Sequence, residues 1–391
     1  MEKLNNMKHS KILFLNILLV IFVFEFITFR INIDAISAAS YILMDGNSGR
    51  VLLKENSERK MHMASTTKIM TAILALESGK LNEKIVITKN MTNIEGCSIH
   101  LIEGEELTLE ELVYAVMLDS ANDASIAIAI QVAGSVAKFV ELMNKKAREI
   151  GAFNTKFQNP NGLGHDQHYT TSYDLALITR YGYNNVPKFQ EIASTKYYKI
   201  PYNNAKNQRQ LKHHNKMLWT YKDCCGVKTG FIKSAGRCLV SAANRNDLLL
   251  ISVTLNDPDD WQDHTQLLDY GFNNYCSRKF LCKDESIVHI WNDQEVLLKV
   301  KDNLSISLKK NEMYNTKVVY KINSNLSDYK KGDVIGKAEI RIGDNAESSV
   351  DLTLDQNLSK FSYTRTLFNL KSTIKSLAKP INLVQIGPLF L

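Results

Sequence analysis

One stretch organises this chain of 391 residues: Ala64-Ser-Thr-Thr-Lys-Ile-Met-Thr-Ala-Ile-Leu-Ala-Leu-Glu77. Its apolar side chains recur with the period of an α-helix, and Gly79 follows where a helix typically ends, so the pattern predicts a helix over residues 65–77. Ser65 and Lys68 are three residues apart and share one face of that helix. The lysine amine can therefore reach the serine hydroxyl.

The start of this predicted helix has the parts of a nucleophilic site. Backbone N–H groups are free in the first turn of a helix, and the helix dipole favours negative charge there. Ser65 is then a candidate nucleophile and Lys68 its candidate base. A lysine acts as a base only when neutral, and burial or a second nearby cation would lower its pKa. Alone the pattern is weak, since Ser57-x-x-Lys60 and Ser372-x-x-Lys375 match it too.

Two further motifs strengthen this interpretation. Ser120-Ala-Asn122 is the only Ser-x-Asn and falls between two predicted buried helices, where a serine and an amide can relay a proton and bind a substrate amide. Lys228-Thr-Gly230 is the only Lys-Thr-Gly and falls in a predicted strand, where it offers a cation, a hydroxyl and a glycine against which substrate can lie. Each motif also has a purely structural explanation. The Ser-x-Asn motif could be a buried hydrogen-bonding pair, and the Lys-Thr-Gly motif could be an ordinary strand end. The ordered set of three is hard to obtain by chance.

The surrounding patterns predict an α/β (α+β) domain with an antiparallel sheet and helices. Apolar runs flank the turn Asp45-Gly-Asn-Ser-Gly49, which predicts a hairpin. Thr108 and Glu111 form a capping box ahead of an apolar helix. Three apolar runs over residues 226–255 predict adjacent antiparallel strands. From about residue 282, short alternating runs predict a small all-β domain.

Both ends of the chain have the composition of targeting segments. Lysines precede an apolar run from Ile12 to Phe29, and small residues follow at 35–39, which predicts an export signal or an uncleaved anchor. The four predicted parts are then a signal or anchor at 1–37, a catalytic domain at 38–278, a β domain at 282–357 and a tail at 358–391. In either case we expect the body of the protein to lie outside the cytoplasm.

The tail is basic and amphipathic. It contains five basic and no acidic residues over 357–391, and apolar side chains recur at helical spacing between residues 364 and 379. Such a segment lies on anionic membrane surfaces, or docks on its own protein; the absence of acidic residues favours the membrane. Most of the net charge of +7 sits in this tail, so the nearly neutral body does not suit nucleic acid.

The cysteines and histidines give weaker indications. Six cysteines are present without a Cys-x-x-Cys pair, so one disulfide or free thiols are both open and no zinc site is expected. His213 and His214 are expected in a solvated loop. Cys238 is expected to lie opposite Thr229 across a hairpin centred near residues 233–234.

The three motifs and their surroundings resemble the serine-type D-alanyl-D-alanine carboxypeptidases, the low-molecular-weight penicillin-binding proteins among the penicillin-recognising serine enzymes. The likeness covers roughly residues 38–275 and rests on four segments, with a weaker one at Tyr329-Lys-Lys-Gly-Asp-Val-Ile-Gly336 in the β domain. The four are Ala64–Ala72, Met117-Leu-Asp-Ser-Ala-Asn-Asp-Ala124, Asn159-Pro-Asn-Gly-Leu163 with His168-Tyr-Thr-Thr171, and Gly226-Val-Lys-Thr-Gly230. The resemblance implies a β-lactamase/transpeptidase-like catalytic domain followed by a small all-β domain.

The resemblance also implies roles for eight residues. Ser65 would attack the carbonyl between the two terminal D-alanines of a peptidoglycan stem peptide, Lys68 would be its base, and Ser120 and Asn122 would assist proton transfer and binding. The strand residues Lys228 and Thr229 would hold the terminal carboxylate. Gly230 would lie along the substrate, and the backbone N–H groups of Ser65 and Phe231 would form the oxyanion hole. No metal or organic cofactor is implied, and β-lactams would be covalent inhibitors.

Several points differ from the family pattern or leave alternatives open. The arginine that many relatives use to hold the carboxylate is missing from residues 257–264; Arg237 and Arg245 are substitutes without a predicted position. His168 is expected to pack its loop, not to catalyse. A β-lactamase is disfavoured because no Glu-x-x-x-Asn occurs over 123–227. A transpeptidase or endopeptidase would differ from a carboxypeptidase only in the acceptor of the acyl group, so this alternative stays open. A non-catalytic wall-binding protein is disfavoured because all three motifs are intact.

Overall fold

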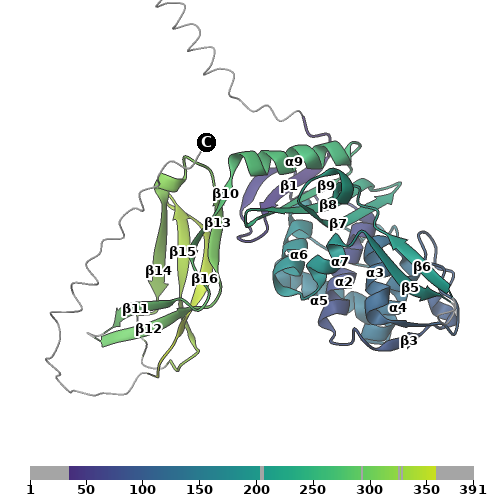
Figure 1. Cartoon of the computed structure of the whole chain (residues 1–391), viewed down its shortest axis with the longest axis horizontal. Coiled ribbons are helices and arrows are strands. Elements are labelled where there is room, and N and C mark those ends of the chain that lie inside the picture. The colour runs from purple at the N-terminus through teal and green to yellow at the C-terminus, as the bar shows by residue number, and fades with distance from the viewer. Residues whose placement is uncertain (1–34, 203–206, 292–293, 325, 327–328, 358–391) are drawn as a thin grey trace, which may run out of the picture.

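The computed structural model describes residues 35–202, 207–291, 294–324, 326 and 329–357 (Figure 1). Its central sheet has five antiparallel strands in the order β2-β1-β9-β8-β7. Their bounds are Ser40–Asp45 (β1), Val51–Glu55 (β2), Cys224–Ile232 (β7), Gly236–Arg245 (β8) and Leu248–Leu255 (β9). The predicted hairpin and the three predicted antiparallel strands are therefore confirmed.

Apolar side chains on both faces of this sheet are covered. All eight residues of β9 are buried. Ile251 and Val253 pack into the core that the helices form on one face, whereas Leu250 packs with Leu267 on the other. Leu267 lies on α9 (Asp260–Asn274), which crosses the sheet on that face (Figure 1), and Met217 of the short helix α8 (Met217–Thr220) joins the same core. A strand buried on both faces needs a continuous apolar run, as the sequence of β9 has.

The remaining long helices gather on the opposite face of the sheet (Figure 1). They are α2 (Lys68–Glu77), α3 (Leu109–Leu118), α4 (Asn122–Ala133), α5 (Val136–Ile150), α6 (Ser172–Asn185) and α7 (Phe189–Ser194), with α8 (Met217–Thr220) a single turn before β7. The predicted capping box is confirmed, because the Thr108 hydroxyl accepts from the Glu111 N–H and the Glu111 carboxylate accepts from the Thr108 N–H.

Two short hairpins complete the catalytic domain. One pairs β3 (Lys84–Val86) with β4 (Glu106–Thr108), and the other pairs β5 (Tyr197–Tyr202) with β6 (Asn207–Lys212). Arg209 on β6 binds Glu105 just before β4 with a separation of 2.9 Å between Nη2 and Oε2. This buried ion pair fixes the two hairpins to each other beside α3.

The C-terminal part is all β, as predicted. A five-stranded sheet has the order β11-β12-β16-β15-β14, and β10 pairs with β13. The bounds are Cys276–Leu281 (β10), Ser286–Trp291 (β11), Gln294–Val300 (β12), Leu304–Leu308 (β13), Thr316–Ile322 (β14), Val334–Ile342 (β15) and Asn345–Leu354 (β16). Leu298, Ile306 and Leu352 belong to one core of its own, separate from the cores of the first domain. The limits of the domains remain a prediction.

A buried polar joint connects the two domains. The Asp45 carboxylate accepts from the Ser307 N–H at 2.8 Å. Arg50 donates to the Ser307 carbonyl at 2.7 Å and makes two hydrogen bonds to the Glu312 carboxylate, at 2.9 and 2.6 Å. Bidentate pairing of this kind fixes orientation as well as distance. The hairpin β1–β2 is thus attached to the β domain through β13.

Other predictions concern cysteines and membrane segments. The six cysteines are all free thiols. Among the described residues no single helix is long and apolar enough to cross a bilayer. Helices α4 and α5 together have the length and composition of a membrane span, but they are bent by 83° relative to each other. The predicted signal or anchor lies outside the described residues except for residues 35–37, and the predicted basic tail lies wholly outside them.

Candidate active site

Ser65 lies in a tight turn that glycines on two other segments approach closely. The turn is a 3-10 helix, η1 (Ala64–Thr67), that leads into α2, so the predicted helix begins with a tighter turn than expected. A Cβ on Gly162 would lie 2.0 Å from the Ala64 carbonyl oxygen, and one on Gly230 would lie 3.0 Å from the Ser65 nitrogen. Only glycine lets both backbones pack so closely against the nucleophile.

Lys68 is buried directly beneath Ser65. Its Nζ lies within hydrogen-bond distance of three partners: Ser65 Oγ at 2.9 Å, Asn122 Oδ1 at 2.7 Å and the Asn161 carbonyl oxygen at 2.6 Å. The side chain is 0% exposed, and none of its three acceptors carries a charge. Burial first and the nearby Lys228 second lower the pKa of Lys68 well below its ordinary value. The lowered pKa favours the neutral amine, which has two N–H groups for Asn122 and Asn161 and a lone pair that can accept the Ser65 proton.

The junction between α3 and α4 supplies Ser120 and Asn122, as predicted. Ser120 is buried and adopts a left-handed conformation (φ 59°), which turns the chain between the two helices. Asn122 begins α4; its Oδ1 accepts from Lys68 and its Nδ2 donates to the Glu95 carbonyl at 2.6 Å. Within the described residues the Ser120 hydroxyl has no hydrogen-bond partner. It is thus free to exchange a proton with a bound substrate.

Strand β7 carries the Lys-Thr-Gly motif at the edge of the central sheet. Lys228 is 0% exposed, and in the described part of the chain its Nζ donates only to the neighbouring Thr229 carbonyl, at 3.3 Å. Burial lowers the pKa of Lys228 to about 8. Phe231 is 65% exposed, so its side chain points toward solvent. A nearly unpaired ammonium in a dry position is suited to an anionic ligand.

The structure brings five of the eight predicted residues together, and the other three are their neighbours in the chain. Direct hydrogen bonds connect Ser65, Lys68 and Asn122, while Gly230 contacts Ser65 and Lys228 lies close enough to Lys68 to depress its pKa. Ser120 lies two residues before Asn122 in the chain. Thr229 and Phe231 lie on either side of Gly230 on β7. The arrangement unites a nucleophile, a neutral amine, an amide, a free hydroxyl and a cation.

The loop that includes Asn161 and Gly162 is a part of the site that sequence reasoning did not select. Asn161 accepts the shortest hydrogen bond of Lys68, through its main chain. Gly162 has a φ of 87°, a conformation that favours glycine. The turn sequence Asn159-Pro-Asn-Gly-Leu163 predicts the loop, but no side-chain pattern shows that a main-chain carbonyl of this loop binds Lys68.

His168 packs this loop against the nucleophile turn, as expected. Its Nδ1 accepts from the Gln158 N–H at 3.0 Å, and its Nε2 lies 2.7 Å from the Thr67 hydroxyl, which donates to the Ala64 carbonyl. Burial lowers the pKa of His168 to about 4. The ring is therefore neutral, with Nε2–H as the donor to Thr67, and it acts as a positioning residue.

The neutral His168 makes stability depend on pH. Because the pKa of the folded state lies below the ordinary value of about 6.5, the unfolded chain takes up this proton first, and stability is lost as pH falls from about 6.5 toward 4. We expect His168→Gln to reduce the loss of unfolding free energy between pH 7 and pH 5 by about 2 kcal/mol. Urea unfolding of both proteins at the two pH values measures this loss of unfolding free energy. Equal losses in both proteins would contradict the assignment.

Three other expectations need correction or placement. The expected solvated position is wrong for His213, which is 2% exposed, whereas His214 is exposed. Between β6 and α8 buried and exposed side chains alternate, and His213 is one of those that face inward. Cys238 lies opposite Gly230 and not Thr229, a register difference of one residue. Arg245 lies at the far end of β8.

Arg237 is the substitute arginine that lies near the site. It pairs with Phe231 across the β7–β8 hairpin. Its Nη2, however, is 2.8 Å from the Asp260 carboxylate at the start of α9. Its charge is thus already paired, which leaves Lys228 as the unpaired cation on β7.

Comparison with known proteins agrees with this geometry. Residues 27–259 match the D-alanyl-D-alanine carboxypeptidase family of peptidases, and residues 275–360 match the C-terminal domain of penicillin-binding protein 5. The D-alanyl-D-alanine carboxypeptidase DacF of Bacillus subtilis is 31% identical over 76% of this chain and 80% of its own length.

Solved structures show the same likeness. Penicillin-binding protein 5 of Haemophilus influenzae superposes with a TM-score of 0.72 at 28% identity, over 83% of this chain and 98% of the other. A mutant of the Streptomyces K15 DD-transpeptidase superposes with a TM-score of 0.58 at 30% identity, over 61% of this chain and 99% of the other. The chain therefore belongs to the D-alanyl-D-alanine carboxypeptidase family of serine peptidases.

Proposed function

We propose that this chain removes the terminal D-alanine from peptidoglycan stem pentapeptides through an acyl-enzyme on Ser65, and that the same serine is acylated by β-lactams. The observation that carries the proposal is the hydrogen bond of 2.9 Å from the buried Lys68 amine to Ser65 Oγ. A buried lysine without a carboxylate partner has little structural value, because its charge is costly to bury. Its position is explained if it serves as the base.

In the acylation step, the neutral Lys68 amine accepts the Ser65 proton while Oγ attacks the carbonyl carbon of the penultimate D-alanine. The C–N bond to the terminal D-alanine then breaks, and its nitrogen takes up the proton that Lys68 accepted, passed on through the Ser120 hydroxyl. Asn122 holds Lys68 and offers its amide to the substrate. Water completes the cycle by attacking the ester, which releases the shortened peptide and restores Ser65.

Two groups on β7 are proposed to recognise the substrate. The Lys228 ammonium and the Thr229 hydroxyl bind the carboxylate of the terminal D-alanine, since no acidic side chain of the described residues lies at bonding distance from Lys228. The backbone N–H groups of Ser65 and Phe231 stabilise the negative charge on the carbonyl oxygen during attack. Gly230 keeps this part of the strand close to the Ser65 nitrogen.

The requirement for a charged Lys228 predicts a pH dependence. Its pKa of about 8 means that kcat/KM falls above about pH 8 as this ammonium loses its proton, while Lys68, whose pKa burial and the nearby Lys228 lower well below its ordinary value, acts as the neutral amine. In Lys228→Arg the cation stays charged at every accessible pH. We expect the fall in kcat/KM above pH 8 to disappear in this variant, even if its absolute rate is lower than that of the parent. A fall at the same pH in Lys228→Arg would show that another group is responsible.

Release of D-alanine tests the proposed activity directly. We expect the purified protein to release one D-alanine from a pentapeptide that ends in D-Ala-D-Ala, with no metal added. A transpeptidase would release D-alanine mainly when an acceptor amine is present, and would transfer the peptide to it. Absence of D-alanine release with and without an acceptor would overturn the proposal.

We also propose an extracytoplasmic location, with export through the N-terminal segment and attachment to a membrane surface through the tail from residue 358. The support is the sequence pattern of both segments together with a wall substrate. Truncation after residue 357 is expected to move the protein from the membrane fraction to the soluble fraction, because the basic apolar tail is removed. Sedimentation with membranes that is unchanged by the truncation would refute this attachment.

A further inference from the structure

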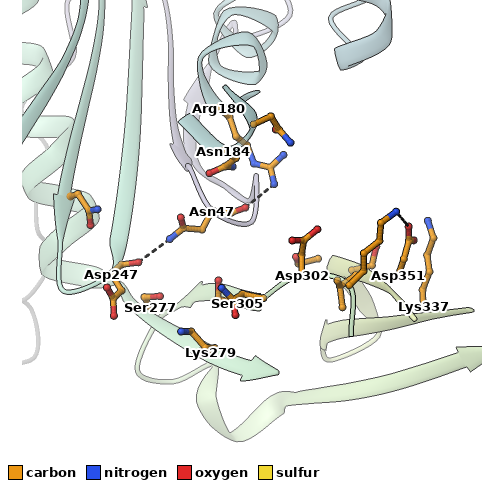
Figure 2. A pocket seen from close by; sticks show the side chains of 17 residues that line it. Asn47, Arg180, Asn184, Asp247, Ser277, Lys279, Asp302, Ser305, Lys337 and Asp351 are labelled. Atoms are coloured by element: carbon orange, nitrogen blue, oxygen red, sulfur yellow. Dashed lines mark hydrogen bonds and ion pairs between the residues drawn. The ribbon is translucent and has the colours of Figure 1, made fainter. Parts of the chain in front are cut away.

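A polar cleft of about 710 Å³ lies between the two domains (Figure 2). On the side of the catalytic domain it is lined by the β1–β2 turn at Asn47, by Arg180 and Asn184 of α6, and by Asp247 in the β8–β9 turn. Strands of the β domain form the other side. Figure 2 shows Lys279, Ser305 and Lys337 facing the cleft from that side.

The two walls of this cleft are held at a fixed separation. The buried joint of Asp45 and Arg50 with Ser307 and Glu312 connects the turn that carries Asn47 to strand β13. Asn47 is itself fixed, because its Nδ2 donates to the Asp247 carbonyl at 2.8 Å and its own carbonyl accepts from Arg180 at 2.7 Å. The cleft is therefore a built feature of the interface, since both of its walls are hydrogen-bonded in place.

The cleft has an excess of positive charge that the protein does not compensate. Lys301 is paired with Asp351 at 3.4 Å, and Asp302 with Lys283 at 3.7 Å. By contrast, Lys279 and Lys337 have no ion pair or hydrogen bond within the described part of the chain.

Arg180 adds a third cation, which has no carboxylate at ion-pair distance among the described residues, although the charge of the Asp45 carboxylate acts on it. It donates only to the Asn47 carbonyl, and its buried Nε has no acceptor among the described residues. Burial lowers the pKa of Arg180, so its charge is poorly solvated. Asp247 is the one lining carboxylate without an ion pair within the described residues. An anion in the cleft would thus be favoured by three cations against one acid.

The rest of the lining determines what kind of anion fits. Only one of the lining residues, Val350, is apolar, and most of the others are asparagine and serine. Pockets of similar volume that take drug-like molecules are lined mainly by apolar and aromatic groups. Amides and hydroxyls instead match the donors and acceptors of a polyhydroxylated ligand. The volume exceeds the need of a single small ion.

We propose that this cleft binds a segment of an acidic glycan, a polyhydroxylated wall polymer that carries carboxylate or phosphate groups. The inference rests on the proposed function, since a wall enzyme meets such a polymer while it works. The β8–β9 turn at the cleft and the β7–β8 hairpin at the active site lie at opposite ends of β8. Ten residues of strand span about 30 Å, so the cleft holds the polymer at a distance from the reacting peptide.

The test separates binding of the polymer from catalysis. Full-length protein carrying Ser65→Ala is mixed with insoluble cell-wall glycan, and the bound fraction is measured by sedimentation over a range of protein concentrations. We expect Lys279→Gln with Lys337→Gln to weaken binding about tenfold, and added salt to reduce this difference. Lys317→Gln, an exposed lysine of β14 outside the cleft, is the matched control and is expected to bind as the parent does.

A second readout uses active protein and a short pentapeptide ending in D-Ala-D-Ala. The double variant is expected to release D-alanine from it at the parental rate, because the peptide is too short to reach the cleft. Glycan binding unchanged in the double variant, or weakened equally by Lys317→Gln, would overturn the proposal, and so would a parallel loss of peptide hydrolysis. If the parent itself failed to release D-alanine while still binding glycan, only the proposed function would be lost.

The source of the negative charge is distinguished by chemistry. Hydrofluoric acid cleaves phosphodiesters and leaves the glycan with its carboxylates. Binding that survives this treatment assigns the anion as carboxylate, and binding that disappears assigns it as phosphate. Either result, with the same dependence on Lys279 and Lys337, supports the site.

Discussion

Replacing Ser65 by alanine is expected to abolish D-alanine release and covalent labelling by a fluorescent penicillin. No other hydroxyl in the described residues is hydrogen-bonded to a buried lysine amine. The loss in kcat/KM should be about 10⁴-fold or more, since the covalent route is removed and only binding and charge stabilisation remain. The fold should be kept, because the change deletes one half-buried oxygen atom. Gel fluorescence after incubation with the penicillin measures labelling.

The chain offers a matched control for this experiment. Ser57-x-x-Lys60 has the same spacing as the proposed catalytic pair, but the Ser57 hydroxyl donates to Glu58 and Lys60 is exposed beside the Tyr169 ring. Ser57→Ala is therefore expected to label like the parent. Labelling that persists in Ser65→Ala, or that disappears in Ser57→Ala with the fold intact, would end the assignment of the nucleophile.

The second large effect is expected from Lys68→Met, which keeps the length of the side chain but removes the amine. Without a base, Ser65 must lose its proton to water, and general-base catalysis of this kind contributes about 10²–10⁴-fold. We expect acylation by penicillin to slow by about 10³-fold, measured as the rate of labelling at fixed penicillin concentration. The variant leaves the buried acceptors on Asn122 and Asn161 without their donor, so near-UV circular dichroism must accompany the rates.

Lys60→Met is the control for this loss, since it removes a lysine at the same spacing from a serine. A rate within a factor of two of the parent is expected for it. Should Lys68→Met acylate at the parental rate, the proton of Ser65 would have to leave by another path. In that case the buried lysine would have a structural role only, and Ser120 would be the next candidate.

Local sequence patterns were sufficient for the elements that carry the site. A helix beginning at the Ser-x-x-Lys motif, a break at Ser120 and a strand at Lys228 follow from apolar periodicity and helix signals within about fifteen residues. The capping box at Thr108 and the apolar run of β9 are equally local. The family resemblance then supplied the roles, which no periodicity contains.

Features that depend on register or on burial of a polar side chain were less accessible. A difference of one residue placed Cys238 opposite Gly230, because the hairpin turn sets the register and its length was misjudged. His213 was expected in solvent, since nothing in its neighbours shows that the segment before α8 packs inward. The main-chain carbonyl of Asn161 leaves no signal in the side-chain pattern.

By itself, then, the sequence predicted the helices and strands that carry the three motifs, the small β domain, and which motifs contain the reactive groups. It did not predict α5 or the hairpins β3–β4 and β5–β6. Tertiary structure decided that those motifs meet, that Lys68 and Lys228 are dry enough to have lowered pKa values, and that two domains enclose a cationic cleft. The physical reason is the distance along the chain over which each effect acts. Propensity and periodicity act over a few residues, whereas desolvation and contact between residues 65, 122 and 230 depend on how distant segments pack against one another.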